Sequence, residues 1–479
     1  MRTDLIFLIP EITLLLMACL VLIVDAFSKD PLHKMTYRMA QLSLVLTLSA
    51  VIYYSPDYSY IAFNGGFITD TMSTLLKSFI CAITIVVFFY SYEYLKENEL
   101  LKGEYFVLGL FAVLGMMVMT SAYHLLSIYL GLELLSLSLY AMVAMQRRST
   151  FATEAAIKYF VLGALASGML LYGISMIYGL TGSLQFNDIV DTINAGDIDR
   201  AYLVYGMIFL IVGISFKLGA APFHMWVPDV YQGAPTSVTL FISSAPKLAA
   251  FAMAVRVLVD GLLPLIEDWQ SILSLLAILS MAVGNIIAIA QTNIKRMLAY
   301  STIAHIGYLF LGLIAGTASG FAGSMFYIIS YALMSLGTFG MIILLGRYDL
   351  KADRLDDFKG LSIRNSWFAF IMLFLMFSMA GVPPFLGFWS KWFVLKELIA
   401  SGFVELAVIA VIFSIIGVYY YLRIVKLMYF DEPETMSDIK ASQQMRAVLT
   451  VNGLLILLIG LAPDSLMHIC LSLNKKSSL

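Results

Sequence analysis

Long apolar runs separated by short polar breaks extend over almost the whole of this 479-residue chain. Because a helix needs roughly 20 residues to cross the hydrocarbon of a bilayer, these runs predict about fourteen transmembrane helices and an all-α integral membrane fold. The expected ranges are 5–26, 39–54, 72–90, 105–120, 123–145, 153–180, 203–231, 236–259, 272–290, 297–314, 321–345, 367–398, 404–428 and 445–461.

Composition agrees with a membrane protein and excludes several other classes. Hydrophobic residues make up 61% of the chain and charged residues 13%, and the mean hydropathy of +0.90 excludes a soluble domain. The net charge of -2, with no basic run and no phosphate-binding glycine loop, excludes a nucleic-acid partner. Cys19, Cys81 and Cys470 lie far apart, so we expect no metal, haem or iron-sulfur cofactor in this chain.

Basic residues gather in alternate loops and so predict the orientation. Loops on one side hold 18 Lys and Arg residues, whereas the other side holds only Arg2, Arg200, Lys475 and Lys476. The positive-inside tendency places the basic loops in the cytoplasm and both termini in the periplasm of a bacterial inner membrane, although a related chloroplast protein would share the pattern. The basic loops are 28–38, 91–104, 146–152, 291–297, 346–366 and 423–446.

Two expected helices carry proline where a helix should not break without cause. Pro222 lies inside 203–231, and Pro383 and Pro384 lie inside 367–398. Proline removes a backbone donor and clashes with the preceding turn, so both helices should be interrupted within the membrane.

The two breaks also suggest an internal repeat. Pro222 and Pro384 are 162 positions apart, and each is followed by Phe and, four or five positions later, by Trp. Two five-helix repeats related by inversion would explain this, because each holds an odd number of crossings; chance similarity between apolar helices is the alternative. The expected division is an N-terminal three-helix segment 1–104, a first repeat 105–259, a second repeat 260–428, and a C-terminal helix and tail 429–479.

Five charged residues lie inside stretches that otherwise appear membrane-spanning: Glu133, Lys158, Lys217, Lys247 and Lys391. Each central charge costs roughly 2.5–3.5 kcal/mol to insert, so such residues usually serve ion movement. Lys158 is only five residues into its helix, so snorkelling to the interface is an alternative.

Other intramembrane polar residues receive different interpretations. Lys77 and Arg256 lie nearer helix ends and are interpreted as interfacial anchors. His224 and His305 are candidate relay groups that would bridge lysines, or simply histidines hydrogen-bonded to a neighbouring helix.

Buried lysines and a carboxylate suit a proton relay, because a lysine gains or loses its proton as its surroundings change. A static buried ion pair that only fixes helix packing is the alternative.

These residues also carry a family resemblance over essentially the whole chain. The run from Phe216 to Thr236, with Val-Tyr-Gln-Gly-Ala-Pro-Thr at its end, resembles the antiporter-like membrane subunits of proton-pumping NADH-quinone oxidoreductase, respiratory complex I. The Val-Tyr-Gln-Gly-Ala-Pro-Thr segment and the Pro246-Lys247 pair resemble the subunit N group, which is related to mitochondrial subunit 2. The segment 293–308 and the Pro383-Pro384 break with Lys391 agree.

The resemblance implies a fourteen-helix, non-redox subunit that translocates protons while NADH reduces quinone elsewhere in the complex. Glu133 and Lys217 resemble the central pair of the family, Lys247 its relay lysine, Lys391 its terminal proton group, and Lys158 a lysine typical of this subunit. Protons would enter from the cytoplasm and leave near Lys391.

The implied partners are the other membrane and peripheral subunits of complex I, which would hold the flavin and iron-sulfur clusters. A cation/proton antiporter, alone or as one subunit of several, and a structural scaffold are the alternatives.

Overall fold

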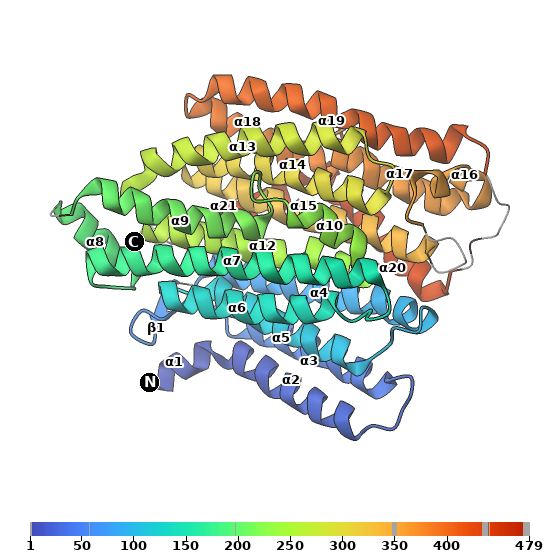
Figure 1. The fold of residues 1–479 in the computed structure, drawn as a ribbon, viewed down its shortest axis with the longest axis horizontal. Coiled ribbons are helices and arrows are strands. Elements are labelled where there is room, and N and C mark those ends of the chain that lie inside the picture. The colour runs from blue at the N-terminus through green and yellow to red at the C-terminus, as the bar shows by residue number, and fades with distance from the viewer. Residues whose placement is uncertain are drawn as a thin grey trace.

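The computed structural model describes residues 2–56, 58–196, 198–346, 352–433, 439 and 441–472. Its helices run mostly along one common direction and form a single bundle (Figure 1). The N-terminal part holds α1 (Arg2–Phe7), α2 (Ile9–Phe27), α3 (Lys34–Tyr53), β1 (Tyr60–Ala62), β2 (Phe67–Thr69) and α4 (Thr71–Glu97).

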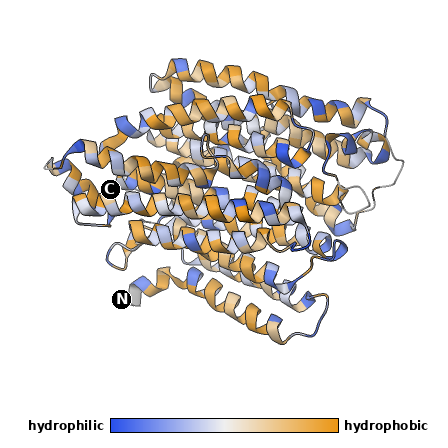
Figure 2. Cartoon of the chain, in the orientation of Figure 1, coloured by the Kyte–Doolittle hydropathy of each residue, from blue (hydrophilic) through white to orange (hydrophobic). Residues whose placement is uncertain are grey.

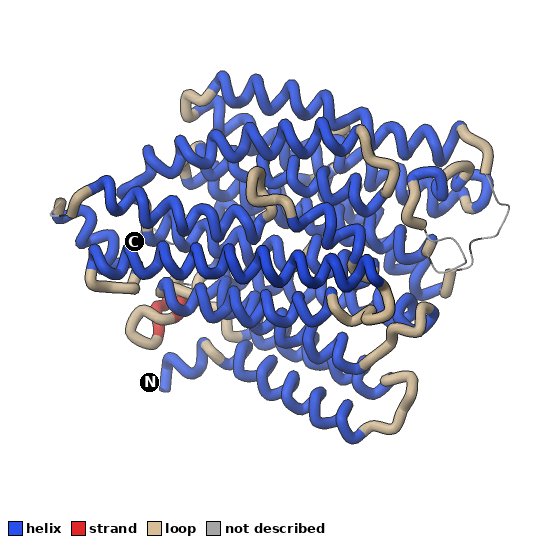
Figure 3. The backbone as a smooth tube through the Cα atoms, in the orientation of Figure 1, coloured by secondary structure: helices blue, strands red, loops and turns tan. Residues whose placement is uncertain are grey.

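The middle and C-terminal parts are helical wherever the structure describes regular elements (Figure 3). The middle part holds α5 (Gly103–Ser121), α6 (Leu125–Val143), α7 (Thr150–Thr181), α8 (Phe186–Ala195), α9 (Arg200–Leu218), α10 (Trp226–Gly233), α11 (Thr236–Ser243), α12 (Ala245–Val255) and the π-helical turn η1 (Arg256–Gly261). The C-terminal part holds the 3-10 turn η2 (Leu263–Leu265), α13 (Ile266–Ile289), α14 (Ile294–Ile314), α15 (Ala318–Leu345), the 3-10 turn η3 (Leu355–Phe358), α16 (Leu361–Arg364), α17 (Ser366–Ala380), α18 (Leu386–Ala400), α19 (Val404–Phe430), α20 (Gln443–Leu461) and α21 (Pro463–Ser472).

The predicted all-α membrane fold is confirmed. Within the described residues, thirteen helical segments are long and apolar enough to span a membrane, and α17 is a shorter apolar helix. Several details were not predicted: β1 and β2 form a small antiparallel hairpin, α8 and α21 are additional helices, and the expected helix 236–259 is divided at Ser244 into α11 and α12.

Burial separates a lipid-facing shell from a central core. The spans of α14 and α15 are wholly buried inside the protein, whereas only about a third of the α7 and α19 spans is buried. The uncovered faces are apolar, with Leu165 63% and Ile415 68% exposed, and hydrophilic residues concentrate near the loops (Figure 2). The bilayer must therefore solvate the outer faces, while the central helices hold the polar groups considered below.

The interpretation of Lys77 and Arg256 as interfacial anchors is wrong. Lys77 is 3% exposed and its Nζ lies 2.5 Å from Oε1 of Glu11 on α2. Arg256 is 3% exposed and pairs with Asp70 and Asp260. Both cations are buried because acidic partners from other turns or helices compensate them.

Candidate functional site

Both predicted helix breaks are present, and they share one geometry. The helix α9 ends at Leu218 with Gly219 at a φ of 84°, and α17 ends at Ala380 with Gly381 at a φ of 87°. A positive φ is readily adopted only by glycine, which explains the residue type at each position. The Ala221–Pro222 and Pro383–Pro384 peptide bonds that follow are both cis.

Lys217 lies one residue before the first break. It is 7% exposed, and its Nζ donates a hydrogen bond of 2.7 Å to Oγ of Ser136 on α6. The ammonium group is therefore held by a neutral hydroxyl inside the bundle.

Glu133 is on α6, three residues before Ser136, and so lies on the same helix face. Its Oε1 is buried and accepts no hydrogen bond from the described residues. The two predicted partners, Glu133 and Lys217, face the same region, but among the described residues they form no direct ion pair within 4.0 Å; Ser136 is the contact that Lys217 makes.

Close helix packing fixes the position of Glu133. A Cβ added to Gly131, two residues earlier, would lie 2.7 Å from the backbone nitrogen of Met119 on α5. Only glycine permits this approach, as is common between membrane helices. This contact fixes the orientation of α6 against α5, and with it the direction in which Glu133 points from the helix.

Lys247 lies on α12 and reaches the first break from the opposite side. Its Nζ donates a 2.7 Å hydrogen bond to the carbonyl oxygen of Leu218, and lies 5.3 Å from the centre of a Trp226 ring. The lysine is 1% exposed. It thereby supplies a donor to a carbonyl that the break leaves without its helical partner, at the negative end of the α9 dipole.

Lys391, on α18 just after the second break, makes a similar contact there. Its Nζ donates to the carbonyl oxygen of Ala380 at 3.0 Å and to Oγ of Ser414 on α19 at 2.9 Å. It also lies 5.1 Å from the ring centre of Tyr308. Like Lys217 and Lys247, it has only neutral partners among the described residues.

His305 lies in a buried hydrogen-bonded cluster between α14, α15 and α19. Its Nδ1 is 2.7 Å from the hydroxyl of Tyr327, and its Nε2 is 3.1 Å from the hydroxyl of Tyr421. Tyr421 also bonds to Ser301, and the ring of Tyr327 stacks on that of Tyr308, which lies beside Lys391. His305 is therefore connected through tyrosines to the second break.

Further hydroxyl contacts continue from this cluster towards the first half of the chain. Thr302 on α14 bonds to the hydroxyl of Tyr331 at 2.7 Å, and Ser335 on α15 donates to Oγ of Ser243 on α11 at 2.9 Å. The contact between Ser335 and Ser243 joins helices on either side of the expected repeat boundary at residue 260.

His224 lies in the turn between α9 and α10, and the structure does not place it between lysines. Its Nδ1 is buried and has no hydrogen-bond partner among the described residues.

Lys158 lies on α7 in a half-exposed ionic cluster. Its Nζ is 2.7 Å from Oδ2 of Asp229 and 2.8 Å from Oε1 of Glu154, and its side chain is 41% exposed. Asp229 on α10 also accepts from Arg296 on α14, at 2.6 Å. Asp229 thus links α10, the second half of the broken helix, to α7 and α14.

Asp229 is the functional candidate that sequence reasoning missed. It lies inside the expected helix 203–231, where a carboxylate stands out as clearly as the lysine of that helix. The cluster borders a cavity of about 190 Å³, also lined by Phe151 and Gln232, which has room for several water molecules.

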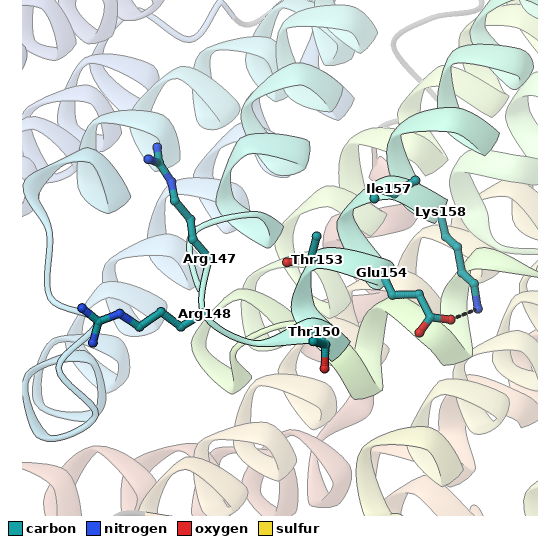
Figure 4. A pocket seen from close by; sticks show the side chains of 7 residues that line it. All are labelled: Arg147, Arg148, Thr150, Thr153, Glu154, Ile157 and Lys158. Carbon is teal, nitrogen blue, oxygen red and sulfur yellow. Dashed lines mark ion pairs between the residues drawn. The ribbon is translucent and has the colours of Figure 1, made fainter.

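A larger hollow of about 520 Å³ adjoins this cavity and shares Glu154 and Lys158 with it; Arg147 and Arg148 also line it. Figure 4 shows Arg147 and Arg148 extending away from Lys158, while Glu154 turns towards it. The basic residues of the turn before α7 therefore fit the interfacial loop that the sequence predicts, and not a common binding site.

Comparisons with known proteins agree with this geometry. Residues 122–417 match the family described as NADH:quinone oxidoreductase/Mrp antiporter, transmembrane region. A subunit N of NADH-quinone oxidoreductase from Thioalkalivibrio sulfidiphilus is 55% identical over 462 residues, with 96% of each chain covered.

Two solved structures share the fold. A chain of respiratory complex I from Thermus thermophilus with bound aureothin is 31% identical, with a TM-score of 0.80 and coverage of 96% of this chain and 98% of that one. A chain of the Mrp complex from Dietzia sp. has a TM-score of 0.85 at 17% identity, with 97% and 96% covered. The latter likeness concerns the fold alone.

Proposed function

The chain belongs to the NADH-quinone oxidoreductase subunit N family of antiporter-like membrane subunits of complex I, and on that premise we propose that it conducts protons through its buried lysines. Lys217, Lys247 and Lys391 form the relay, with Glu133 beside the first of them. Its partners are the other complex I subunits, and NADH oxidation and quinone reduction take place on those partners.

The observation that carries the proposal is the kind of partner that each buried lysine has. Lys77 is held directly by a carboxylate, as a structural cation would be. Lys217, Lys247 and Lys391 instead donate to hydroxyl or carbonyl oxygens. A buried ammonium without a counterion releases its proton more readily than one in an ion pair, which suits a relay better than a scaffold.

The surroundings supply groups through which a proton moves. Ser136 both accepts from Lys217 and donates to the carbonyl oxygen of Leu132. Lys217 precedes Leu218, whose carbonyl oxygen binds Lys247. Hydroxyls and water would complete the steps between them.

The second half continues the route. His305 takes part with both ring nitrogens in hydrogen bonds to tyrosines, which permits a neutral ring to accept a proton on one side and donate on the other. We place the exit near Lys391, the cytoplasmic entrance at the Asp229 cavity, and both termini in the periplasm.

We further propose that the two breaks belong to inverted five-helix repeats. A glycine of positive φ ends the first half of each broken helix, and Gly219 and Gly381 are 162 positions apart, the same spacing as Pro222 and Pro384, which supports this. Flavin and iron-sulfur clusters are assigned to partner subunits, since the lysine sites offer no ligand set for them.

The test is a Lys217→Met variant of the assembled complex in proteoliposomes. Proton uptake is followed with an enclosed pH-sensitive dye while NADH oxidation is recorded. We expect proton pumping to be lost, whereas Lys426→Met, which changes a side chain that is 69% exposed, pumps normally. A Lys217→Met complex that assembles and pumps at the wild-type rate would falsify the relay.

A further inference from the structure

A second charged cluster lies at the end of the bundle that holds the β hairpin and α8, opposite the basic loops (Figure 1). Nη2 of Arg256 is 2.8 Å from both carboxylate oxygens of Asp70, and Nη1 is 2.8 Å from Oδ2 of Asp260. Two carboxylates share one guanidinium, so the cluster carries a net negative charge. By the positive-inside orientation, this end faces the periplasm.

The two carboxylates are not equivalent. Asp70 is 8% exposed, caps α4 and also accepts from the amide of Ser73 at 2.8 Å. The side chain of Asp260 is 24% exposed, and its Oδ1 accepts no hydrogen bond within the described part of the chain. Asp70 is thus fully engaged, while Asp260 keeps one oxygen available to water.

A cavity of about 90 Å³ opens beside the cluster. It is lined by Asp70, Arg256 and Asp260 together with apolar side chains such as Phe251 and Ala322. A water molecule needs roughly 10–15 Å³ of such space, so the cavity accommodates several. Its polar lining distinguishes it from an empty apolar packing defect.

Two hydroxyls next to the cluster also favour water in this region. Thr69 precedes Asp70, and Ser121 follows Thr120, whose carbonyl oxygen accepts from Arg256. Both hydroxyl oxygens are buried and have no partner among the described residues. Buried hydroxyls are normally satisfied by protein or ordered water.

The helix that carries the relay lysine leads to this cavity. Phe251 and Val255 lie four and eight positions after Lys247 and both line the cavity, so they share a face of α12 with the lysine. Phe251 is the residue between Lys247 and the cavity on this face. The helix then continues through the π-helical turn that holds Arg256 and Asp260, a distortion often found at functional sites.

From this arrangement we propose that Asp260 is the proton-release group of the first half of the chain, with Arg256 as its positioning residue. The inference rests on the proposed relay and adds an exit to the one near Lys391. A proton leaves the ammonium nitrogen of Lys247, crosses to the cavity through water when Phe251 moves aside, and binds Oδ1 of Asp260. Lys247 becomes neutral, and Asp260 regains its negative charge when it releases the proton to the periplasm.

The charged surroundings of Asp260 are compatible with this role. Arg256 contacts it directly and Asp70 shares that arginine. Asp188 on α8, the helix packed against η1, is bonded to Ser183. Within the described residues, Arg256 is therefore the one cation paired with Asp260, and it keeps the carboxylate in place without occupying Oδ1.

The test uses the assembled complex in proteoliposomes and measures protons moved per NADH oxidised. We expect Asp260→Asn to lower this ratio, though by less than Lys247→Met, because the exit near Lys391 remains; the double variant should lose no more than Lys247→Met alone, and Asp260→Glu should restore the ratio. Asp268→Asn is the matched control, because Asp268 is a half-buried carboxylate paired with Arg200, and it should keep the wild-type ratio.

A normal ratio for assembled Asp260→Asn beside a lowered ratio for Lys247→Met overturns the release site and leaves the relay standing. A normal ratio for Lys247→Met overturns the relay and the release site together. If Asp260→Asn does not assemble, Ala322→Leu decides, since it fills the cavity without changing a charge: a normal ratio in that variant overturns the inference.

Discussion

The ion pair between Lys77 and Glu11 provides a quantitative test of how this fold is held together. The side chains are 3% and 5% exposed, and they join α4 to α2. Lys77→Met keeps the aliphatic stem and removes the ammonium, which leaves the carboxylate buried. Removing one partner of a buried pair is expected to destabilise by about 3–5 kcal/mol. The local opening of α2 from α4 should therefore become about two to three and a half orders of magnitude more frequent.

Cys81 offers a readout, because it lies one helical turn after Lys77 and its side chain is fully buried. Cys19 and Cys470 are first replaced by serine, so that Cys81 is the remaining thiol of this subunit. A small water-soluble maleimide is then added, and its rate of reaction with Cys81 measures the opening. Mass spectrometry distinguishes labelling of this subunit from labelling of the other complex I subunits.

The Glu11→Met/Lys77→Met double variant is the control, since apolar replacement of both partners is often neutral or stabilising. Labelling of Lys77→Met at the wild-type rate would refute the reasoning.

Two further predictions concern the other ionic clusters. Burial disfavours the charged form of Asp70, but Arg256 and the Ser73 amide outweigh this effect and hold the pKa of Asp70 below its ordinary value. The ionised Asp70 therefore stabilises the folded protein above about pH 4, and this contribution is lost as the pH falls through the pKa that Asp70 has in the folded protein. Asp70→Asn should lower the melting temperature of the complex at pH 7, with a difference from wild type that narrows below pH 4; a constant difference would contradict this. Asp229→Asn should destabilise by only about 1–2 kcal/mol, because Lys158 and Arg296 are half-exposed; chemical denaturation that shows a loss above 3 kcal/mol would contradict this.

The features that the sequence determined by itself are those that depend on neighbouring residues. The length of each apolar run dictates a membrane crossing, because backbone polar groups in lipid must be satisfied within the helix. Pro222 and Pro384 determine the breaks through local backbone chemistry. The depth of Lys217 and Lys247 within their runs identified them as buried, which the structure bears out.

Only the tertiary structure decided which charges meet. Lys77 and Arg256 were misjudged because their partners, Glu11 and Asp70, come from other helices or loops, and the energy of a buried charge depends on that partner more than on its distance from a helix end. The contact of Lys217 with a serine instead of Glu133 has the same origin. Hydrophobic periodicity determines where helices lie along the chain, but ion pairing acts through space, and residues far apart in the sequence are brought together by packing alone.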